Sequence, residues 1–289
     1  PMKPFPTRDA RTRVLFRFGG GVALAGLYGP HFSGAVLNEW DDGRFGGENP
    51  HLAPTWENGR FFLLQPFETL YIPLPMLSLG LDRLLFGLNP LAFRLHNLCL
   101  FLVCGFLLLQ ILRQLGIRSS IAFSAALLWM LNPQKIESVQ WIAERKDLVA
   151  GALFLAATFC FVRSLRKGAV PVVAAVLGLL AVCSKPTAFP LPGVLLVAGL
   201  CLTHGKPARE RLRLLVLPIA LPALGIAWAW SVTAQTMPFS LRSSFAVPWH
   251  NLSCHPLTAV FPFELSPIYP PIDGFAPYLP MYAGVLLFL

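Results

Sequence analysis

Two adjacent aspartates, Asp41 and Asp42, follow a long apolar run and are the first residues in the chain that could carry out acid–base chemistry. Two carboxyl groups side by side at a boundary of low dielectric constant raise the pKa of one of them. A carboxylate with a raised pKa can act as a general base and take a proton from an acceptor hydroxyl. The same pair is more often a solvated acidic loop that ends a helix, and the spacing alone leaves both interpretations open.

A second group of charged residues lies in the segment 132–147, between two apolar runs. Glu137, Trp141 and either Glu144 or Arg145 follow one another at three to four residues, so a helix would place them on one face. Arg145 could hold a phosphate through its bidentate fork, and Lys146 could do so as a point charge. An ion-paired helix cap at the membrane interface fits this pattern equally well.

Lys185 stands between two apolar runs in the sequence Ser184-Lys185-Pro186. It could contribute to an anion site, although a lysine that extends from a helix end into the interface is the more frequent explanation. Farther along are four possible metal ligands whose spacing matches no zinc pattern: His250, His255, Glu264 and Asp273. The residue pattern therefore identifies no metal.

The elements that must position these residues are membrane helices. Of the 289 residues, 55% are hydrophobic and only 13% are charged, whereas an ordinary soluble domain has about 25% charged residues. This composition excludes a water-soluble single domain, and 6 cysteines over this length exclude a disulfide scaffold. We expect an all-α fold, a polytopic transmembrane helical bundle forming one domain over residues 1–289.

Long runs without interior charge mark the expected spans, because a helix needs about 20 mostly apolar residues to cross the hydrocarbon core. The runs lie near residues 14–37, 91–112, 117–131, 148–162, 169–184, 187–202, 214–232 and 279–289. The last run would cross only part of the core, so we expect the chain to be truncated at its C-terminus. The runs do not alternate as the strands of a β-barrel do.

Basic residues predict the orientation of the spans. With the N-terminus in the cytoplasm, the inner segments contain Lys3, Arg8, Arg11, Arg13, Arg17, Arg113, Arg118, Arg163, Arg166, Lys167, Lys206, Arg209, Arg211 and Arg213, and only two acids, Asp9 and Glu210. This is a strong positive-inside bias. The net charge of +9 is therefore explained by topology, and no nucleic acid is expected as a partner.

Two long outer loops, 38–90 and 233–278, contrast with short inner loops, so we expect the protein to act on its outer side. The first outer loop contains apolar stretches punctuated by prolines. Such stretches are typical of helices that lie in the membrane interface and contact membrane lipid.

Several motifs, in the order in which they occur, resemble those of the GT-C superfamily of membrane glycosyltransferases. The resemblance is strongest to the bacterial branch related to protein O-mannosyltransferases, whose members often carry tetratricopeptide repeats. The motifs are Asp41-Asp42, Glu48-Asn49-Pro50-His51, Leu85-Phe86-Gly87-Leu88-Asn89-Pro90, Leu95-His96-Asn97, Asn132-Pro133, the run from Glu137 to Asp147, and Ser184-Lys185-Pro186. The run from Glu137 to Asp147 is the most specific of these.

The resemblance implies a polyprenyl-phosphate-linked sugar as donor, with mannose as one candidate sugar, and a protein hydroxyl or a glycan as acceptor. It implies transfer with inversion on the outer (periplasmic) face of the bacterial inner membrane. Asp41 would be the leading catalytic base and Asp42 its partner, while Glu137 would position the acceptor or the sugar. Arg145, Lys146 or Lys185 would neutralise the departing phosphate; use of a divalent cation varies across the superfamily.

Three positions depart from the family pattern, which has Tyr, His and His where this chain has Trp40, Ile72 and Asn132. The acid pair and the basic turn remain, so the resemblance still allows activity, while the two missing histidines leave an altered choice of acceptor or a loss of activity as alternatives. Two alternatives from other functional classes remain: a lipid or solute transporter or flippase, and a non-catalytic membrane scaffold. Ion-coupled transport is disfavoured because the apolar runs carry almost no ionisable residue away from their ends.

Overall fold

A computed structural model describes residues 20–29 and 41–236, and these residues form helices joined by turns. Within those two ranges there is no strand, and the one β-bridge joins Phe67 and Leu70. The predicted all-α fold is therefore confirmed. Three helical segments are long and apolar enough to cross a membrane: Pro90–Gln114, Ile142–Arg166 and Ala208–Thr233. The chain is a multi-pass membrane protein by this criterion.

A short helix covers residues 20–28. The elements that follow are α2 (Asp42–Phe45), η2 (Pro50–Leu52), α3 (Trp56–Leu64), α4 (Pro73–Phe86), α5 (Pro90–Gln114), α6 (Ser119–Met130), α7 (Gln134–Gln140), η3 (Ile142–Glu144), α8 (Arg145–Arg166), α9 (Val172–Val182), η4 (Pro186–Ala188), α10 (Leu191–Leu202) and α11 (Ala208–Thr233), where η marks a 3₁₀ turn.

The three long helices extend past the apolar runs that predicted them. α8 begins at Arg145 rather than near residue 148, because its first charged residues are paired with other side chains and so can lie inside the helix. By contrast, α6, α9 and α10 contain 12, 11 and 12 residues. At 1.5 Å per residue they are about 16–18 Å long, well short of a hydrocarbon core of about 30 Å. The expected span at 279–289 and the outer loop from residue 237 onward lie outside the described residues.

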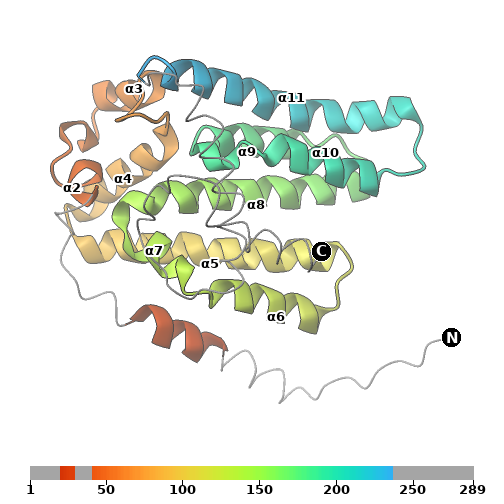
Figure 1. The fold of residues 1–289 in the computed structure, drawn as a ribbon, viewed down its shortest axis with the longest axis horizontal. Helices are drawn as coiled ribbons and strands as arrows, with labels where there is room; N and C mark the ends of the chain where they lie inside the picture. Colours follow the sequence, from red (N-terminus) through yellow and green to blue (C-terminus); the bar gives the residue numbers. More distant parts are fainter. Residues whose placement is uncertain (1–19, 30–40, 237–289) are drawn as a thin grey trace, which may run out of the picture. The chain divides into compact units, whose positions relative to one another are not determined.

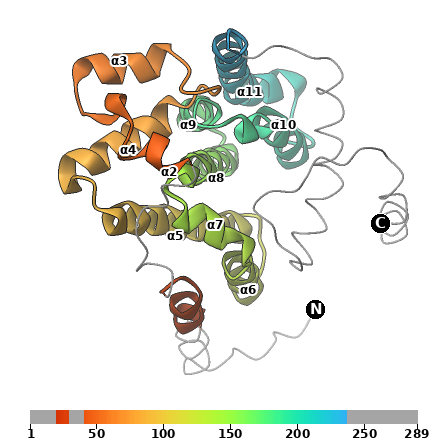
Figure 2. The ribbon, with the colours of Figure 1, turned by 60° about the vertical axis from the view of Figure 1, so that its left-hand side comes forward.

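α8 is the central helix of the bundle. It packs against α5, α9 and α10, and α11 lies on α9 and α10 (Figures 1 and 2). The core at this centre consists mainly of alanine and leucine side chains, such as Ala157, Ala181 and Leu195, together with Phe161. Small residues allow the backbones of membrane helices to approach closely. A Cβ atom at Gly178 on α9 would lie 2.7 Å from Cγ of Pro222 on α11, so these two helices are in tight contact.

α11 contains two prolines four residues apart, Pro218 and Pro222. Each proline lacks the N–H that would bond to the carbonyl four residues earlier. The part of α11 after the prolines packs through Ala229 and Val232 against Tyr71.

The segment expected to form the first outer loop contains several helices. α2, α3 and α4 gather at the end of the bundle where α8 begins, on the left in Figure 1. Their buried side chains form one core with Ile142 and Ala143, which connects this cap to the start of α8. On α4 the apolar side chains of Leu84, Leu85 and Phe86 are exposed. Exposed apolar side chains are expected for a helix at the membrane interface, and the location of α4 there remains a prediction.

Residue contacts divide the chain into two units, residues 1–131 with 135–237 and residues 132–134 with 238–289. The first unit contains nearly all of the described helices. The second lies almost entirely outside the described residues, so the expectation of a single domain stays a prediction.

Candidate active site

Asp42 is a buried carboxylate held at the junction of α2 and η3. Its side chain is 0% exposed. Oδ1 accepts a hydrogen bond of 2.8 Å from the backbone N–H of Ala143, a residue more than 100 positions away in the sequence. Oδ2 is also buried and, among the described residues, has no hydrogen-bond partner. One oxygen is therefore fixed by the fold, and the other keeps an unused capacity to accept a hydrogen bond.

A tight turn places this carboxylate against η3. The N–H of Gly46 bonds to the carbonyl of Gly43 and ends α2 after one turn. A Cβ atom at Gly46 would lie 2.7 Å from the carbonyl oxygen of Asp42, so only glycine fits this close approach. The local sequence thus explains why so short a helix can bury its first residue.

The pKa of Asp42 is raised from its ordinary value. Burial is the main cause, because it disfavours the charged form. Hydrogen bonds from the backbone of Ala143 and Ile142 and the positive charge of Arg94 oppose the shift, and the charge of Asp41 adds to it. A carboxylate in this environment holds a proton more strongly than a solvated one, which is the property required of a general base.

A cavity of about 150 Å³ lies beside Asp42. Glycines of the α2 turn form one wall, and Pro90, Phe93 and Ile142 belong to the opposite side. Since one water occupies about 30 Å³ in the liquid, the cavity has room for a hydroxyl-bearing side chain but not for a lipid. Its size suits the acceptor end of a reaction better than the donor end.

The two adjacent aspartates occupy different environments. Asp41 is half-buried at the N-cap position of α2, and its side chain makes no capping hydrogen bond. Asp42, next to it, is fully buried against η3. Of the two, Asp42 has the surroundings that suit a base.

A cluster of alternating charges lies next to Asp42 along α8. The carboxylate of Glu144 is 2.8 Å from Nζ of Lys146 and 3.1 Å from Nζ of Lys185. Nζ of Lys185 also lies 2.6 Å from Oδ1 of Asp147. Lys146 in turn stands 4.8 Å from the centroid of the Phe45 ring on α2, within the range of a cation–π interaction. The structure therefore brings Lys146 and Lys185 together beside the helix that carries Asp42.

The pKa of Lys185 reflects this cluster. Burial by itself lowers the pKa of the ammonium group, but the carboxylates of Asp147 and Glu144 outweigh burial, and the net pKa is raised. Lys185 therefore stays protonated over the whole physiological pH range and supplies a permanent positive charge.

Glu137 belongs to the same electrostatic neighbourhood. Its side chain is exposed on α7. Burial of part of the carboxyl group and the negative charge of Glu144 raise its pKa, while Lys185 and Lys146 act in the opposite direction. An exposed carboxylate next to two lysines is placed to contact an incoming substrate.

Arg145 faces away from these lysines and into the protein, where its side chain is 0% exposed. Its guanidinium donates to Oδ2 of Asp82 at 2.7 Å and to the carbonyl of Phe93 at 2.8 Å. It also donates to Oγ of Ser78 at 3.0 Å and to Oδ1 of Asn97. Arg145 thus ties α4 and α5 to the start of α8, and the structure does not place it with Lys146 and Lys185.

The partners of Arg145 include residues that sequence reasoning missed. Asp82 is 1% exposed, and its other oxygen lies 2.6 Å from Nδ1 of His96. The sequence did offer one signal for this pair: Asp82 is a lone acid inside the apolar stretch that forms α4. A carboxylate buried in such a stretch needs a partner. His96 and Asn97 were noted only as part of a family motif.

No group of three or more His, Cys, Asp or Glu side chains in the described part of the chain is arranged to hold a metal ion.

Comparison with known proteins gives a distant and partial match. The chain is 34% identical over 99 residues to "Protein O-mannosyl-transferase TMTC1" of Mus musculus, covering 34% of this chain and 10% of that protein. It is 34% identical over 101 residues to the Homo sapiens protein of the same name, covering 35% of this chain and 12% of that protein. The match thus spans about a tenth of the length of these curated relatives. No family model matches the chain, and no solved structure matches it significantly.

Proposed function

We propose that this chain is the membrane part of a glycosyltransferase of the GT-C type, which moves a sugar from a polyprenyl-phosphate donor to a hydroxyl acceptor. The observation that carries the proposal is Asp42, a buried carboxylate with one oxygen fixed by Ala143, the other unpartnered among the described residues, and a small cavity beside it. The partial similarity to an O-mannosyl-transferase supports the same conclusion and makes mannose the first sugar to test.

Asp42 would act as the general base. As the acceptor oxygen attacks the anomeric carbon of the sugar, its proton passes to Oδ2 of Asp42. The bond between the anomeric carbon and the phosphate oxygen breaks, and its electron pair leaves with the polyprenyl phosphate. A single displacement of this kind inverts the configuration at the anomeric carbon, and no covalent enzyme intermediate forms.

Lys185 and Lys146 would stabilise the departing phosphate. Negative charge develops on the phosphate as the glycosidic bond breaks, and preorganised positive charges favour that transition state. The carboxylates of Glu144 and Asp147 hold the two ammonium groups in position before substrate arrives. Glu137 would contact the acceptor or the sugar, while Arg145 would act as a positioning residue through its bonds to α4 and α5.

The positive-inside bias supports a cytoplasmic N-terminus and a reaction on the outer face. In that orientation the cap of α2, α3 and α4 faces the compartment in which lipid-linked sugars are used by this class of enzyme. The acceptor would be a protein hydroxyl or a glycan.

The test is transfer of labelled mannose from polyprenyl-phosphate mannose by the full-length protein in membranes. Asp42→Asn removes the base without changing its size, and we expect it to lower transfer by about 10²–10⁴-fold. Asp41→Asn is the matched control, since it removes the neighbouring charge, and we expect it to retain most of the activity. Retention of full activity by Asp42→Asn would exclude Asp42 as the base.

The same membranes distinguish the competing functions. If the labelled donor changes leaflet but is not consumed, the protein is a flippase. If the donor is neither consumed nor translocated by the full-length protein, the result supports the alternative of a non-catalytic membrane scaffold.

A further inference from the structure

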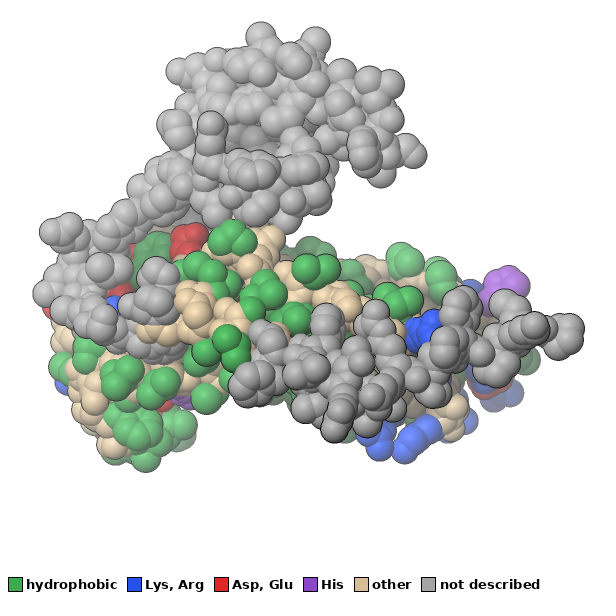
Figure 3. Space-filling model, turned by 90° about the horizontal axis from the view of Figure 1, so that it is seen from below, with side chains coloured by type: hydrophobic (Ala, Val, Ile, Leu, Met, Phe, Trp, Pro, Cys, Tyr) green, Lys and Arg blue, Asp and Glu red, His purple; other side chains and the backbone are tan. Residues whose placement is uncertain are grey.

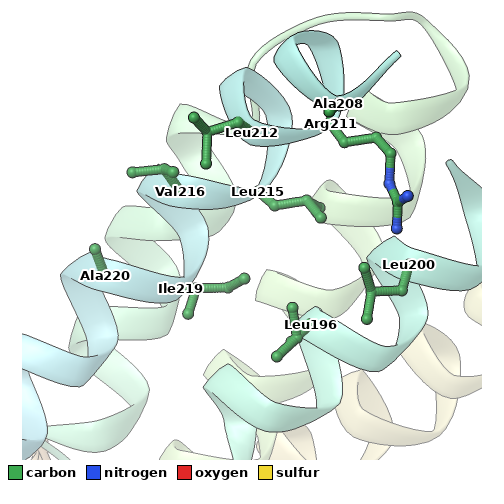
Figure 4. Close-up of a pocket in the computed structure, with 9 residues that line it drawn as sticks. All are labelled: Leu196, Leu200, Ala208, Arg211, Leu212, Leu215, Val216, Ile219 and Ala220. Carbon is green, nitrogen blue, oxygen red and sulfur yellow. The ribbon is translucent and has the colours of Figure 1, made fainter. Parts of the chain in front are cut away.

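An apolar groove lies between α10 and α11, at the end of the bundle opposite to the candidate active site. We call it the inner groove. It has a volume of about 450 Å³ and is walled by Leu196 and Leu200 of α10 and by Leu212 and Val216 of α11 (Figure 4). These four side chains are 40–64% exposed. A Cβ atom at Gly199 of α10 would meet Leu215 of α11 and Phe161 of α8, so these three helices pack closely beside the inner groove.

The inner groove is far from Asp42. Phe161 lies 16 residues after Arg145 on α8, which corresponds to about 24 Å at 1.5 Å per residue. A ligand in the inner groove would therefore not contact the candidate active site, and the two sites can be tested separately.

Arg211 is the one charged residue among those that line the inner groove. Its side chain reaches from α11 toward Leu200 on α10 (Figure 4). Within the described residues, its guanidinium has no hydrogen-bond or ion-pair partner. The nearest acid in the sequence, Glu210, is instead paired with Lys206. An unpaired guanidinium beside an apolar wall is suited to an anion that carries a hydrocarbon chain.

The start of α11 adds to the positive potential. Its N-cap residue is Pro207, whose side chain cannot accept a hydrogen bond from the helix. The first N–H groups of a helix have no partner within the helix, and they carry the positive end of its dipole. The 26-residue helix that starts at Ala208 therefore directs its dipole to the same end of the groove as Arg211.

The surroundings also favour an anionic lipid. On the face shown in Figure 3, Lys and Arg side chains gather at the right-hand end, where α8 and α10 end and α11 begins in Figure 1. α11 is one of the helices long and apolar enough to cross a membrane. The apolar wall thus belongs at the depth of the acyl chains, and Arg211 belongs near the headgroups, where basic residues attract anionic lipids.

We propose that the inner groove binds a phospholipid with an anionic headgroup from the cytoplasmic leaflet. One acyl chain lies along Leu196, Leu212 and Val216. The headgroup phosphate bonds to the guanidinium of Arg211 and faces the first turn of α11. Free phosphate would leave the apolar wall uncovered. A zwitterionic lipid also offers a phosphate to Arg211, but its headgroup brings a second cation next to the guanidinium, so its net charge is zero and it should bind more weakly.

The experiment is a lipid titration of the delipidated full-length protein by native mass spectrometry. The probes are phosphatidylglycerol, phosphatidylcholine and inorganic phosphate. We expect the wild type to bind phosphatidylglycerol more tightly than phosphatidylcholine. We expect Arg211→Ala to weaken phosphatidylglycerol binding about tenfold, as loss of a charge-assisted hydrogen bond implies, and Arg211→Lys to restore part of it.

Two further variants separate the inner groove from general surface charge. Arg213→Ala removes an exposed arginine that is two residues from Arg211 and does not line the groove. We expect the affinity of this variant for phosphatidylglycerol to stay within about twofold of that of the wild type. Ala208→Trp fills the groove mouth while keeping Arg211, and we expect it to lower phosphatidylglycerol binding. Equal losses for Arg213→Ala and Arg211→Ala, equal binding of the two lipids by the wild type, or displacement of lipid by inorganic phosphate would each overturn the proposal.

Discussion

Removing the carboxylate of Asp82 should strongly destabilise the protein, because it leaves the charge of Arg145 buried without a counter-ion. The two side chains are 1% and 0% exposed, and Nη2 of Arg145 lies 2.7 Å from Oδ2 of Asp82. Removing one partner of a buried ion pair costs about 3–5 kcal/mol. We expect Asp82→Ala to lower the free energy of unfolding by that amount, measured as reversible unfolding in mixed micelles by circular dichroism.

Asp82→Asn should have a smaller effect of about 2 kcal/mol, since it keeps an acceptor for Arg145 and loses only the charge-assisted part of the bond. The control is Arg44→Ala, which breaks an exposed pair with Glu68 at 3.8 Å and should cost less than about 1 kcal/mol. The double variant Asp82→Leu with Arg145→Met removes both charges and should be more stable than Asp82→Ala. A loss below about 1 kcal/mol for Asp82→Ala, or a double variant less stable than Asp82→Ala, would refute the reasoning.

Three further predictions follow from the site and the core. The rate of sugar transfer should rise as the pH rises through the raised pKa of Asp42, because only the ionised carboxylate accepts a proton. The stability that Asp42 contributes to the fold should be present below the ordinary carboxyl pKa and lost as the pH rises through the raised pKa. pH profiles of the transfer rate and of the free energy of unfolding should show both trends in the wild type and neither in Asp42→Asn. Lys185→Met should lower sugar transfer at least tenfold with little change in acceptor KM, since we place Lys185 at the leaving phosphate. Gly178→Ala should lower the free energy of unfolding by about 1–3 kcal/mol, because the new methyl group would meet the rigid ring of Pro222, whereas Gly193→Ala, which has open space around it, should not.

Hydropathy predicted the long helices from the sequence because the interiors of α5, α8 and α11 are continuous apolar runs. It did not predict where α8 begins. Arg145, Lys146 and Asp147 look like an interhelical turn, but they lie within the helix because residues distant in the sequence pair with them. Such pairing is a tertiary contact, and the pattern of a single segment does not contain it.

The acid pair was predicted as a candidate site with Asp41 as the leading base, whereas the surroundings in the structure favour Asp42 for that role. Consecutive residues in a helix point about 100° apart, so Asp42 faces the core while Asp41 remains half-buried. Spacing alone cannot say which of two neighbours faces inward. The pairing of Lys185 with Asp147 and Glu144 was hidden for the same reason, since it depends on α9 returning alongside α8.

Pro218 and Pro222 weaken the backbone hydrogen bonding in the middle of α11. Each removes one backbone hydrogen bond, and a helix bends most easily where such bonds are missing. The residues of α11 that line the inner groove all precede Pro222, and the segment after Pro222 packs on Tyr71 in the cap. Pro222 is also held against Gly178 of α9. α11 should therefore bend most easily between Pro218 and Pro222, and a bend there would change the angle between the segment that lines the inner groove and the segment that contacts Tyr71.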